Sequence, residues 1–143
     1  MAVKLGNDYL IFVATPGGTP SYLMLGGQQS GTFNDARNSS DGSHKTSGGF
    51  NLSIAGNRTI SIDLGFVADL PDTGYSLVEA AYAANTPLLV QMRDAGASSA
   101  IGDAVFTCEM RAFNRNVETP LNGTVTGSFT FQPSAAPTLD LTL

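Results

Sequence analysis

The chain is short of several residue types, and each shortage argues against a class of function. It has one cysteine, so no disulfide can form within the chain. One histidine and one thiol provide no Cys/His spacing for a metal. Tryptophan is absent, which counts against a carbohydrate-binding module, because such modules commonly stack sugars on Trp. No phosphate-binding Gly-rich loop and no G-x-S-x-G motif occurs. We therefore expect no metal, no cofactor and no catalysis.

Charge is also scarce. Charged residues make up 13% of the 143 residues, against ~25% in a typical soluble domain. The 7 Lys and Arg are scattered and the formal net charge is −5, so there is no basic patch that would hold nucleic acid. No apolar run approaches the ~20 residues of a membrane span, and the N-terminal MAVKLGNDYL lacks the apolar run of a signal peptide. The sequence predicts one domain, made in the cytoplasm, that does not bind membranes.

β-strand patterns fill most of the chain. Alternating apolar residues and Gly/Pro turn signals predict seven or eight strands. They cover residues 8–15, 21–25, 28–33, 50–54, 59–68, 87–93, 103–114 and 123–132. Cys108 alternates with apolar neighbours, as a small buried core residue does. Because strands with one apolar face need a second layer, we predict a mainly β fold, a two-sheet antiparallel β-sandwich with one short flanking α-helix.

The stretch Leu70–Gly74, LPDTG, matches two known motifs. A sortase signal lies near the C-terminus before a membrane span, and neither condition holds here. The Asp-Thr-Gly of an aspartic protease follows an apolar strand, whereas here Pro precedes it and a helix pattern follows. We interpret the stretch as a corner between a strand and that helix. Ser76 and Glu79 form a predicted capping box, and Asn85 in the left-handed conformation ends the helix.

Two segments have no evident partner within the chain. Asn34–Gly49, NDARNSSDGSHKTSGG, has almost no apolar content and is longer than ordinary loops. Pro133–Leu143 ends in TLDLTL, which has strand character and nothing local to pair with. We predict that a neighbouring subunit orders both segments; a floppy surface loop is the alternative for the first.

The order of these elements resembles that of a known family. An N-terminal strand pair beginning GNDYLIFV is followed by the long polar loop and a strand that ends at an Asp-containing corner. The Ala-rich helix LVEAAY, the strand PLLVQM and two final alternating strands complete the order. This arrangement is similar to the tail tube (major tail) proteins of long-tailed phages and gene transfer agents, in the branch that includes those of lactococcal-type siphophages.

The resemblance implies a single tail tube domain over residues 1–143. Copies would form homo-hexameric rings by joining their sheets edge to edge, and the rings would stack into a hollow tube that DNA crosses without specific binding. Implied partners are the tape measure, tail terminator and distal tail proteins. The protein would be a virion tail component assembled in the host cytoplasm. Paired edges would remove an aggregation hazard, and an acidic lumen would keep phosphates from sticking.

The resemblance also assigns candidate functional residues. The loop 34–49 and both chain ends, Met1–Asn7 and Pro133–Leu143, would bridge adjacent rings. The loop candidates are Asp35, Arg37, Asp41, His44 and Lys45, and those of the C-terminal arm are Leu139, Leu141 and Leu143. The strand faces opposite the core provide the lumen candidates Ser61, Asp63, Thr107, Glu109 and Arg111, with Arg111 paired to Glu109. Deletion of Asp41–Ser47 should then leave the fold intact and stop ring stacking.

Two other interpretations remain open from the sequence. A secreted tube protein of a bacterial contractile injection system would share the fold and the assembly. A monomeric β-sandwich module that binds a ligand or decorates a capsid would share the fold alone. Purified protein that forms rings or tubes favours the first interpretation, and a persistent monomer favours the module.

Overall fold

The structure is a computed structural model of the 143-residue chain, and it describes residues 9–46, 48–68, 72–94 and 104–141. Several predicted features lie outside these residues: the N-terminal segment Met1–Asn7, the Leu70-Pro71 start of LPDTG, and Leu143 of the C-terminal arm. Among the described residues, no helix is long and apolar enough to cross a membrane.

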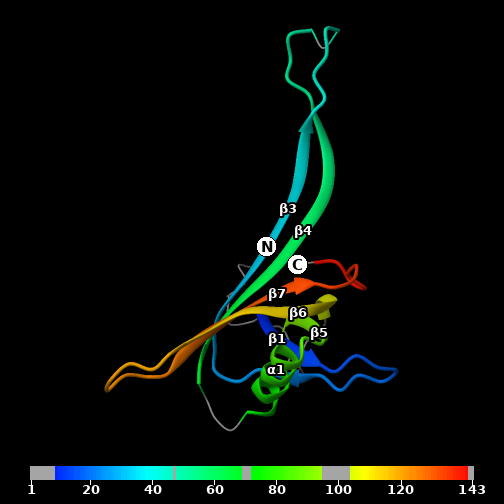
Figure 1. The fold of residues 1–143 in the computed structure, drawn as a ribbon. Coiled ribbons are helices and arrows are strands. Elements are labelled where there is room, and N and C mark those ends of the chain that lie inside the picture. Colours follow the sequence, from blue (N-terminus) through cyan, green and yellow to red (C-terminus); the bar gives the residue numbers. More distant parts are fainter. Residues whose placement is uncertain (1–8, 47, 69–71, 95–103, 142–143) are drawn as a thin grey trace.

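The described residues form seven strands and one helix (Figure 1). In chain order they are β1 (Tyr9–Ala14), β2 (Leu23–Met24), β3 (Gln28–Asp41), β4 (Ser53–Val67), α1 (Thr73–Ala84), β5 (Leu88–Asp94), β6 (Ala104–Glu118) and β7 (Thr126–Pro133). All strand pairs are antiparallel, in the order β2-β1-β5-β6-β7-β4-β3. The mainly β antiparallel fold with one helix is confirmed. The described strands form one continuous sheet, whereas the sequence predicts two.

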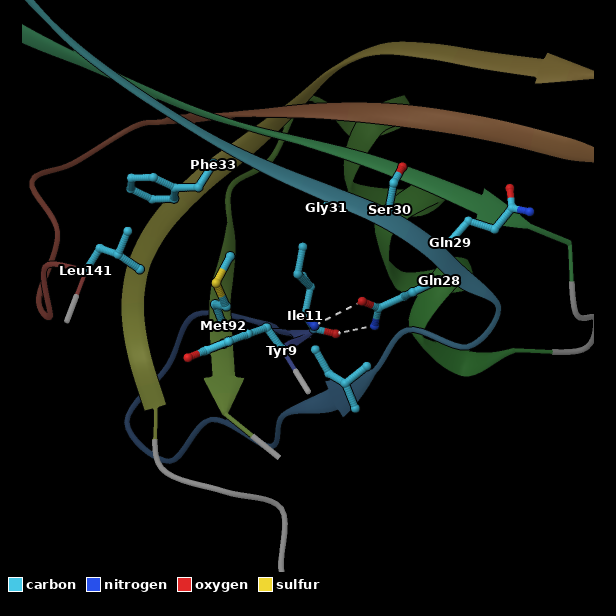
Figure 2. Close-up of a pocket in the computed structure, with 10 residues that line it drawn as sticks. Tyr9, Ile11, Gln28, Gln29, Ser30, Gly31, Phe33, Met92 and Leu141 are labelled. Carbon is cyan, nitrogen blue, oxygen red and sulfur yellow. Dashed lines mark hydrogen bonds between the residues drawn. The ribbon is translucent and has the colours of Figure 1, made fainter. Parts of the chain in front are cut away.

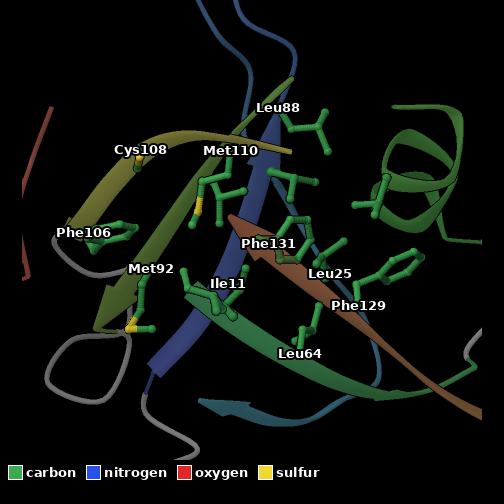
Figure 3. Close-up of a cluster of buried hydrophobic side chains, with 14 of the residues drawn as sticks. Ile11, Leu25, Leu64, Leu88, Met92, Phe106, Cys108, Met110, Phe129 and Phe131 are labelled. Atoms are coloured by element: carbon green, nitrogen blue, oxygen red, sulfur yellow. The ribbon is translucent and has the colours of Figure 1, made fainter. Parts of the chain in front are cut away.

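The sheet curls around a single apolar core, which Figure 3 shows between β1, β5 and β6 on one side and β4 and β7 on the other. The helix packs on the same core through Tyr75, Val78 and Ala81. Alternation places one face of each strand inside, so the fully buried residues include Phe106, Phe129 and Phe131. One curled sheet buries its apolar face as well as two separate sheets would.

Cys108 is fully buried, as predicted. Burial, with a smaller contribution from the charge of Glu109, raises the pKa of its thiol to about 11. The thiol is therefore neutral at pH 7 and unreactive, because the thiolate is the nucleophile.

The predicted loop 34–49 is half strand. β3 continues to Asp41, and its last residues pair with β4 as far as Asp41 opposite Ser53. The predicted division into separate strands at 50–54 and 59–68 is also wrong, because β4 runs unbroken from Ser53 to Val67. Neither face of this part of the hairpin is buried, so the apolar alternation that marks a strand is absent. Backbone pairing between β3 and β4 supplies the order instead.

The helix begins one turn earlier than the sequence predicts. Its N-cap is Asp72, whose carboxylate accepts hydrogen bonds from the backbone N–H of Gly74 (2.9 Å) and of Gly26 (2.6 Å). Ser76 therefore lies inside the helix, where its hydroxyl donates to the Asp72 carbonyl, and the predicted capping box with Glu79 is wrong. The Asp72 carboxylate is the better cap because it satisfies two backbone donors at once. The predicted helix end at Asn85 is confirmed, with φ 54°.

Asp72→Ala is expected to destabilise the subunit by about 1–3 kcal/mol, because it removes the cap and leaves the N–H of Gly26 without its acceptor. Ser76→Ala is the matched control, and we expect it to cost about 0.5 kcal/mol or less. Urea unfolding of the two variants measures both values. A larger loss of stability for Ser76→Ala than for Asp72→Ala would instead support the capping box of Ser76 and Glu79.

Candidate functional site

Besides the short end of the sheet at β2, two long strand edges are open among the described residues. β3 pairs with β4 on one side, and within the described part of the chain no strand pairs with its other side. β6 pairs with β5 only as far as Met110 opposite Leu88, so its distal half, residues 111–118, is paired on the β7 side alone. Unpaired edges of this length invite a strand from another chain. The four longest strands, β6-β7-β4-β3, therefore form a unit that is open on both sides.

Two hairpins project from opposite ends of that unit (Figure 1). β4 pairs with β7 only over residues 62–67, so Ser53–Ser61 extends beyond one end of β7 together with β3. At the other end, Val67 lies opposite Thr126, and the hairpin between β6 and β7 continues past β4. Figure 1 shows the β3–β4 hairpin reaching far above the body and the β6–β7 hairpin extending on another side.

The tip of the β3–β4 hairpin carries three of the five predicted loop residues. Ser43 hydrogen-bonds the Asp41 carboxylate through its side chain and its backbone N–H, and these bonds lower the pKa of Asp41. His44 shares a hydrogen bond with Thr46 (Nδ1 to Oγ1, 2.8 Å), and Lys45 is exposed nearby. The tip also exposes apolar side chains that are not among the predicted contacts: Phe50, Leu52 and Ile54. Exposed apolar groups at the end of a long arm are typical of a contact surface.

The other two predicted loop residues lie near the base of this hairpin. The Arg37 guanidinium donates to the Gly56 carbonyl (3.1 Å) across the hairpin. Asp35 accepts from Arg58 of β4 (2.6 Å), and Arg58 also binds Asp140 of the C-terminal segment (2.7 Å). The Arg58 guanidinium lowers the pKa of Asp35 and lowers that of Asp140 to about 2. Arg58 thus joins the hairpin to the C-terminal segment.

Arg58→Gln is expected to raise the carboxyl titration midpoint of Asp140 from about 2 toward ~3.9, its ordinary value. The pKa is lowered in the folded state, so the ion pair holds above the ordinary pKa and is lost as the pH falls through about 2. Carboxyl ¹³C NMR titration measures the midpoint. Arg37→Gln is the control and leaves the Asp140 midpoint unchanged. An unchanged midpoint in Arg58→Gln contradicts the pairing.

The C-terminal segment lies on its own subunit as far as the structure describes it. It follows the edge of β6 beyond the end of β7, where Thr107 and Leu139 form a backbone bridge. Leu141 packs against the core. The expectation that the tail has nothing local to pair with is therefore wrong for residues 134–141. The edge of β6 left free by the short β7 provides the partner, and no sequence signal marked it.

The lumen candidates lie on the face of the sheet opposite the core. Asp63 accepts hydrogen bonds from Asn34 (3.0 Å) and Thr130 (2.9 Å) on the neighbouring strands. One row of cross-strand partners on this face reads Thr32, Asp63, Thr130 and Phe113. Ser61 is two residues from Asp63 on β4 and faces the same side. The face is mainly polar and spans all four strands.

The β6 candidates each bind another partner. The Arg111 guanidinium donates to the carbonyl and side chain of Asn85 at the end of the helix, both at 3.3 Å. Glu109 accepts from the Ser134 hydroxyl (3.0 Å), and the Thr107 hydroxyl accepts from Gln91 (3.1 Å). The predicted pairing of Arg111 with Glu109 is therefore wrong, because closer polar groups flank each of them.

A cavity of about 540 Å³ lies where the curled sheet fails to close, between the edges of β1 and β3 (Figure 2). Its lining is mostly apolar and includes Tyr9, Ile11, Gln28, Phe33, Met92 and Leu141. The Gln28 side chain bridges the gap: its amide oxygen accepts from the Ile11 N–H (3.0 Å) and its amide nitrogen donates to the Ile11 carbonyl (2.9 Å). One side chain thus caps a backbone position that a neighbouring strand would otherwise pair with.

None of the sequence predictions assigned a contact to Asp72, Arg58, Asp140 or Gln28. Asp72 had a local signal, an Asx residue before a helix pattern, which the Ser76 motif obscured. The other three act between segments 17 to 82 residues apart, and no local pattern marks such contacts.

Known proteins share the sequence pattern and the fold of this chain. A protein-family model described as "phage tail tube protein" matches residues 3–138. A comparison with curated protein sequences gave no significant match. The fold is similar to the tail of an empty gene transfer agent particle solved with C6 symmetry (TM-score 0.79, 16% identity, covering 99% of this chain and 100% of that one).

Two further solved structures are similar. One is the SPP1 tail tube (TM-score 0.76, 17% identity, 95% of this chain and 80% of that one). The other is from the anti-feeding prophage baseplate (TM-score 0.64, 7% identity, 94% of each chain). At these identities the likeness shows a shared fold.

Proposed function

The chain belongs to the phage tail tube protein family, and we propose that it is a structural subunit whose copies form stacked rings around the channel of a virion tail. The observation that carries the proposal is the pair of open edges on the four-strand unit, β3 on one side and distal β6 on the other. The subunit acts by assembly, without catalysis.

The chain directions of β3 and β6, the two strands with open edges, are compatible with a closed ring. Neighbours in the unit β6-β7-β4-β3 are antiparallel, so β3 and β6 run in opposite directions. A second copy, placed by rotation with its distal β6 beside β3 of the first, continues the antiparallel pattern. Repetition of this heterologous contact closes into a ring and pairs both of these edges in every copy. The ring has six members if it follows the gene transfer agent tail, which was solved with C6 symmetry.

The β3–β4 hairpin supplies the contact between rings. It extends beyond the end of β7, and its tip exposes Phe50, Leu52 and Ile54. Asp41, His44 and Lys45 add polar contacts at the same place. In the free subunit the tail, with Leu139 and Leu141, is docked on β6 and the core, so the hairpin carries this role.

The polar sheet face with Ser61 and Asp63 lines the channel in this proposal. Its opposite face is occupied by the core and so is unavailable to the lumen. Asp63 is exposed there, and the net charge of −5 per chain adds to a field that repels phosphate. DNA then crosses without specific binding. Assembly in the host cytoplasm, with a tape measure, a tail terminator and a distal tail protein as partners, completes the proposal.

Electron microscopy of the purified protein tests this function. At rising concentration we expect rings and then tubes, because each added copy pairs two edges that are open in the monomer. A monomer that persists at millimolar concentration contradicts the proposal and favours the module. The second candidate is a tube protein of a contractile injection system. It is supported by the fold shared with the anti-feeding prophage structure, at 7% identity.

A further inference from the structure

The cavity between β1 and β3 is level with the distal part of β6. Cross-strand partners form a row across the unit that reads Val117, Gly127, Phe66 and Gln28. Directly opposed residues in antiparallel strands point to the same face, and Phe66 belongs to the core. Val117 is therefore on the core side of β6, and Gln28, at the other end of the row, lines the cavity.

Val117 is poorly covered on that side by the described residues of its own subunit. Its side chain is 49% exposed although it faces the same way as the core. Glycine at position 127 lets the row pack closely: a Cβ there would lie 2.5 Å from the Asn116 carbonyl oxygen and 2.6 Å from the Phe66 ring. The row thus begins with an uncovered apolar side chain beside one open edge. It ends at an unfilled apolar cavity beside the other.

Resting on the ring closure described under Proposed function, we propose that Val117 of one copy seals the β1–β3 cavity of the next copy in the ring. When distal β6 pairs with the outer edge of β3, it brings Val117 to the face and the height of Gln28–Phe33. Of this segment, Gln28, Gln29, Ser30, Gly31 and Phe33 line the cavity. The stagger that a barrel requires decides which of them lies directly opposite. The occupant is a second copy of this chain, and the apolar lining matches the side chain that it offers.

Cysteine crosslinking tests the contact. Val117→Cys is combined in turn with Gln29→Cys, Gly31→Cys or Phe33→Cys, in protein first shown by electron microscopy to form rings. Adjacent antiparallel strands place opposed Cα atoms ~4.5–5.5 Å apart, within the range that a disulfide bridges. The only native thiol, Cys108, is fully buried. Val117→Cys with Thr19→Cys, in the exposed turn between β1 and β2, is the control.

We expect a ladder of covalent multimers on non-reducing gels for at least one of the three pairs and none for the control. Val117→Asp should raise the concentration needed for ring formation at least ~10-fold, because a charge replaces the apolar group that the cavity receives. Its monomer should unfold as the wild type does. Rings in which none of the three pairs crosslinks overturn this inference and leave the tail tube function standing. Failure of the wild type to form rings overturns both.

Discussion

Replacing residues 42–52 with an Asn-Gly turn is expected to abolish stacked tubes while the subunit stays folded. Asp41 and Ser53 are direct cross-strand partners, so a two-residue turn joins them without a change of register. The removed tip includes Phe50 and Leu52, which are 75% and 42% exposed and contribute little to the core. The change therefore removes most of the proposed contact between rings, leaving Asp41 and Ile54, and keeps the open edges that form each ring.

The measurement combines thermal unfolding with negative-stain microscopy. We expect a melting temperature within a few degrees of wild type and single rings in place of tubes. The matched control replaces the exposed turn between β1 and β2, residues 16–20, with a turn of equal length, and it should still give tubes. Normal tubes from the shortened hairpin would contradict its assignment. Replacing residues 42–52 is a better test than the deletion of Asp41–Ser47 predicted from the sequence, because Asp41 is part of the β3–β4 ladder.

Phe129→Ala is expected to cost about 3–5 kcal/mol of stability, the largest loss that we expect from a single substitution. Phe129 is 1% exposed and stacks on Phe66 with ring centroids 5.7 Å apart. It also contacts Phe131 and Tyr82, so truncation leaves a cavity between β7, β4 and the helix. For a domain of this size such a loss lowers the melting temperature by about 6–20 °C.

Phe113→Ala is the matched control for that substitution. Phe113 is 42% exposed and lies on the face opposite the core, in the row with Asp63 and Thr130. The same loss of a ring there should cost about 1 kcal/mol or less. Urea unfolding of the two variants gives both values. Equal costs would mean that the two faces of the sheet are not divided into core and surface as the structure has them.

The core was predictable because its signal is local. Ile60, Ile62, Leu64 and Phe66 alternate along one strand, and all four are buried. The apolar runs at 8–15 and 87–93 and the alternating stretch at 123–132 are also strands, with small shifts of their ends. Alternation needs one buried face, so it identifies strands only where the core covers them.

The β3–β4 hairpin was mispredicted for the same reason. From Asn34 to Asp41 both faces of β3 meet solvent, and polar residues suit both. The sequence therefore looks like a loop although its backbone is paired with β4. The number of sheets could likewise not be predicted from local sequence patterns, because a curled sheet and two stacked sheets bury the same alternating residues.

For the candidate contact residues, too, exposure could be predicted from the sequence and long-range partners could not. Exposure of Asp41, Lys45 and Asp63 follows from their polarity, and the structure places all three at the surface. The partners of Arg58 and Arg111 depend on how distant segments meet, so no local pattern indicates them. The same holds for the Gln28 bridge, which exists only because β1 and β3 approach without pairing.

A helical reconstruction of tubes assembled from the purified chain by cryo-electron microscopy tests the central claim most directly. It should show β3 of each subunit hydrogen-bonded to residues 111–118 of the adjacent subunit's β6, with the Asp63 face toward the channel. A solvent-exposed outer edge of β3 in the assembled tube would contradict the claim that identical neighbours complete this sheet.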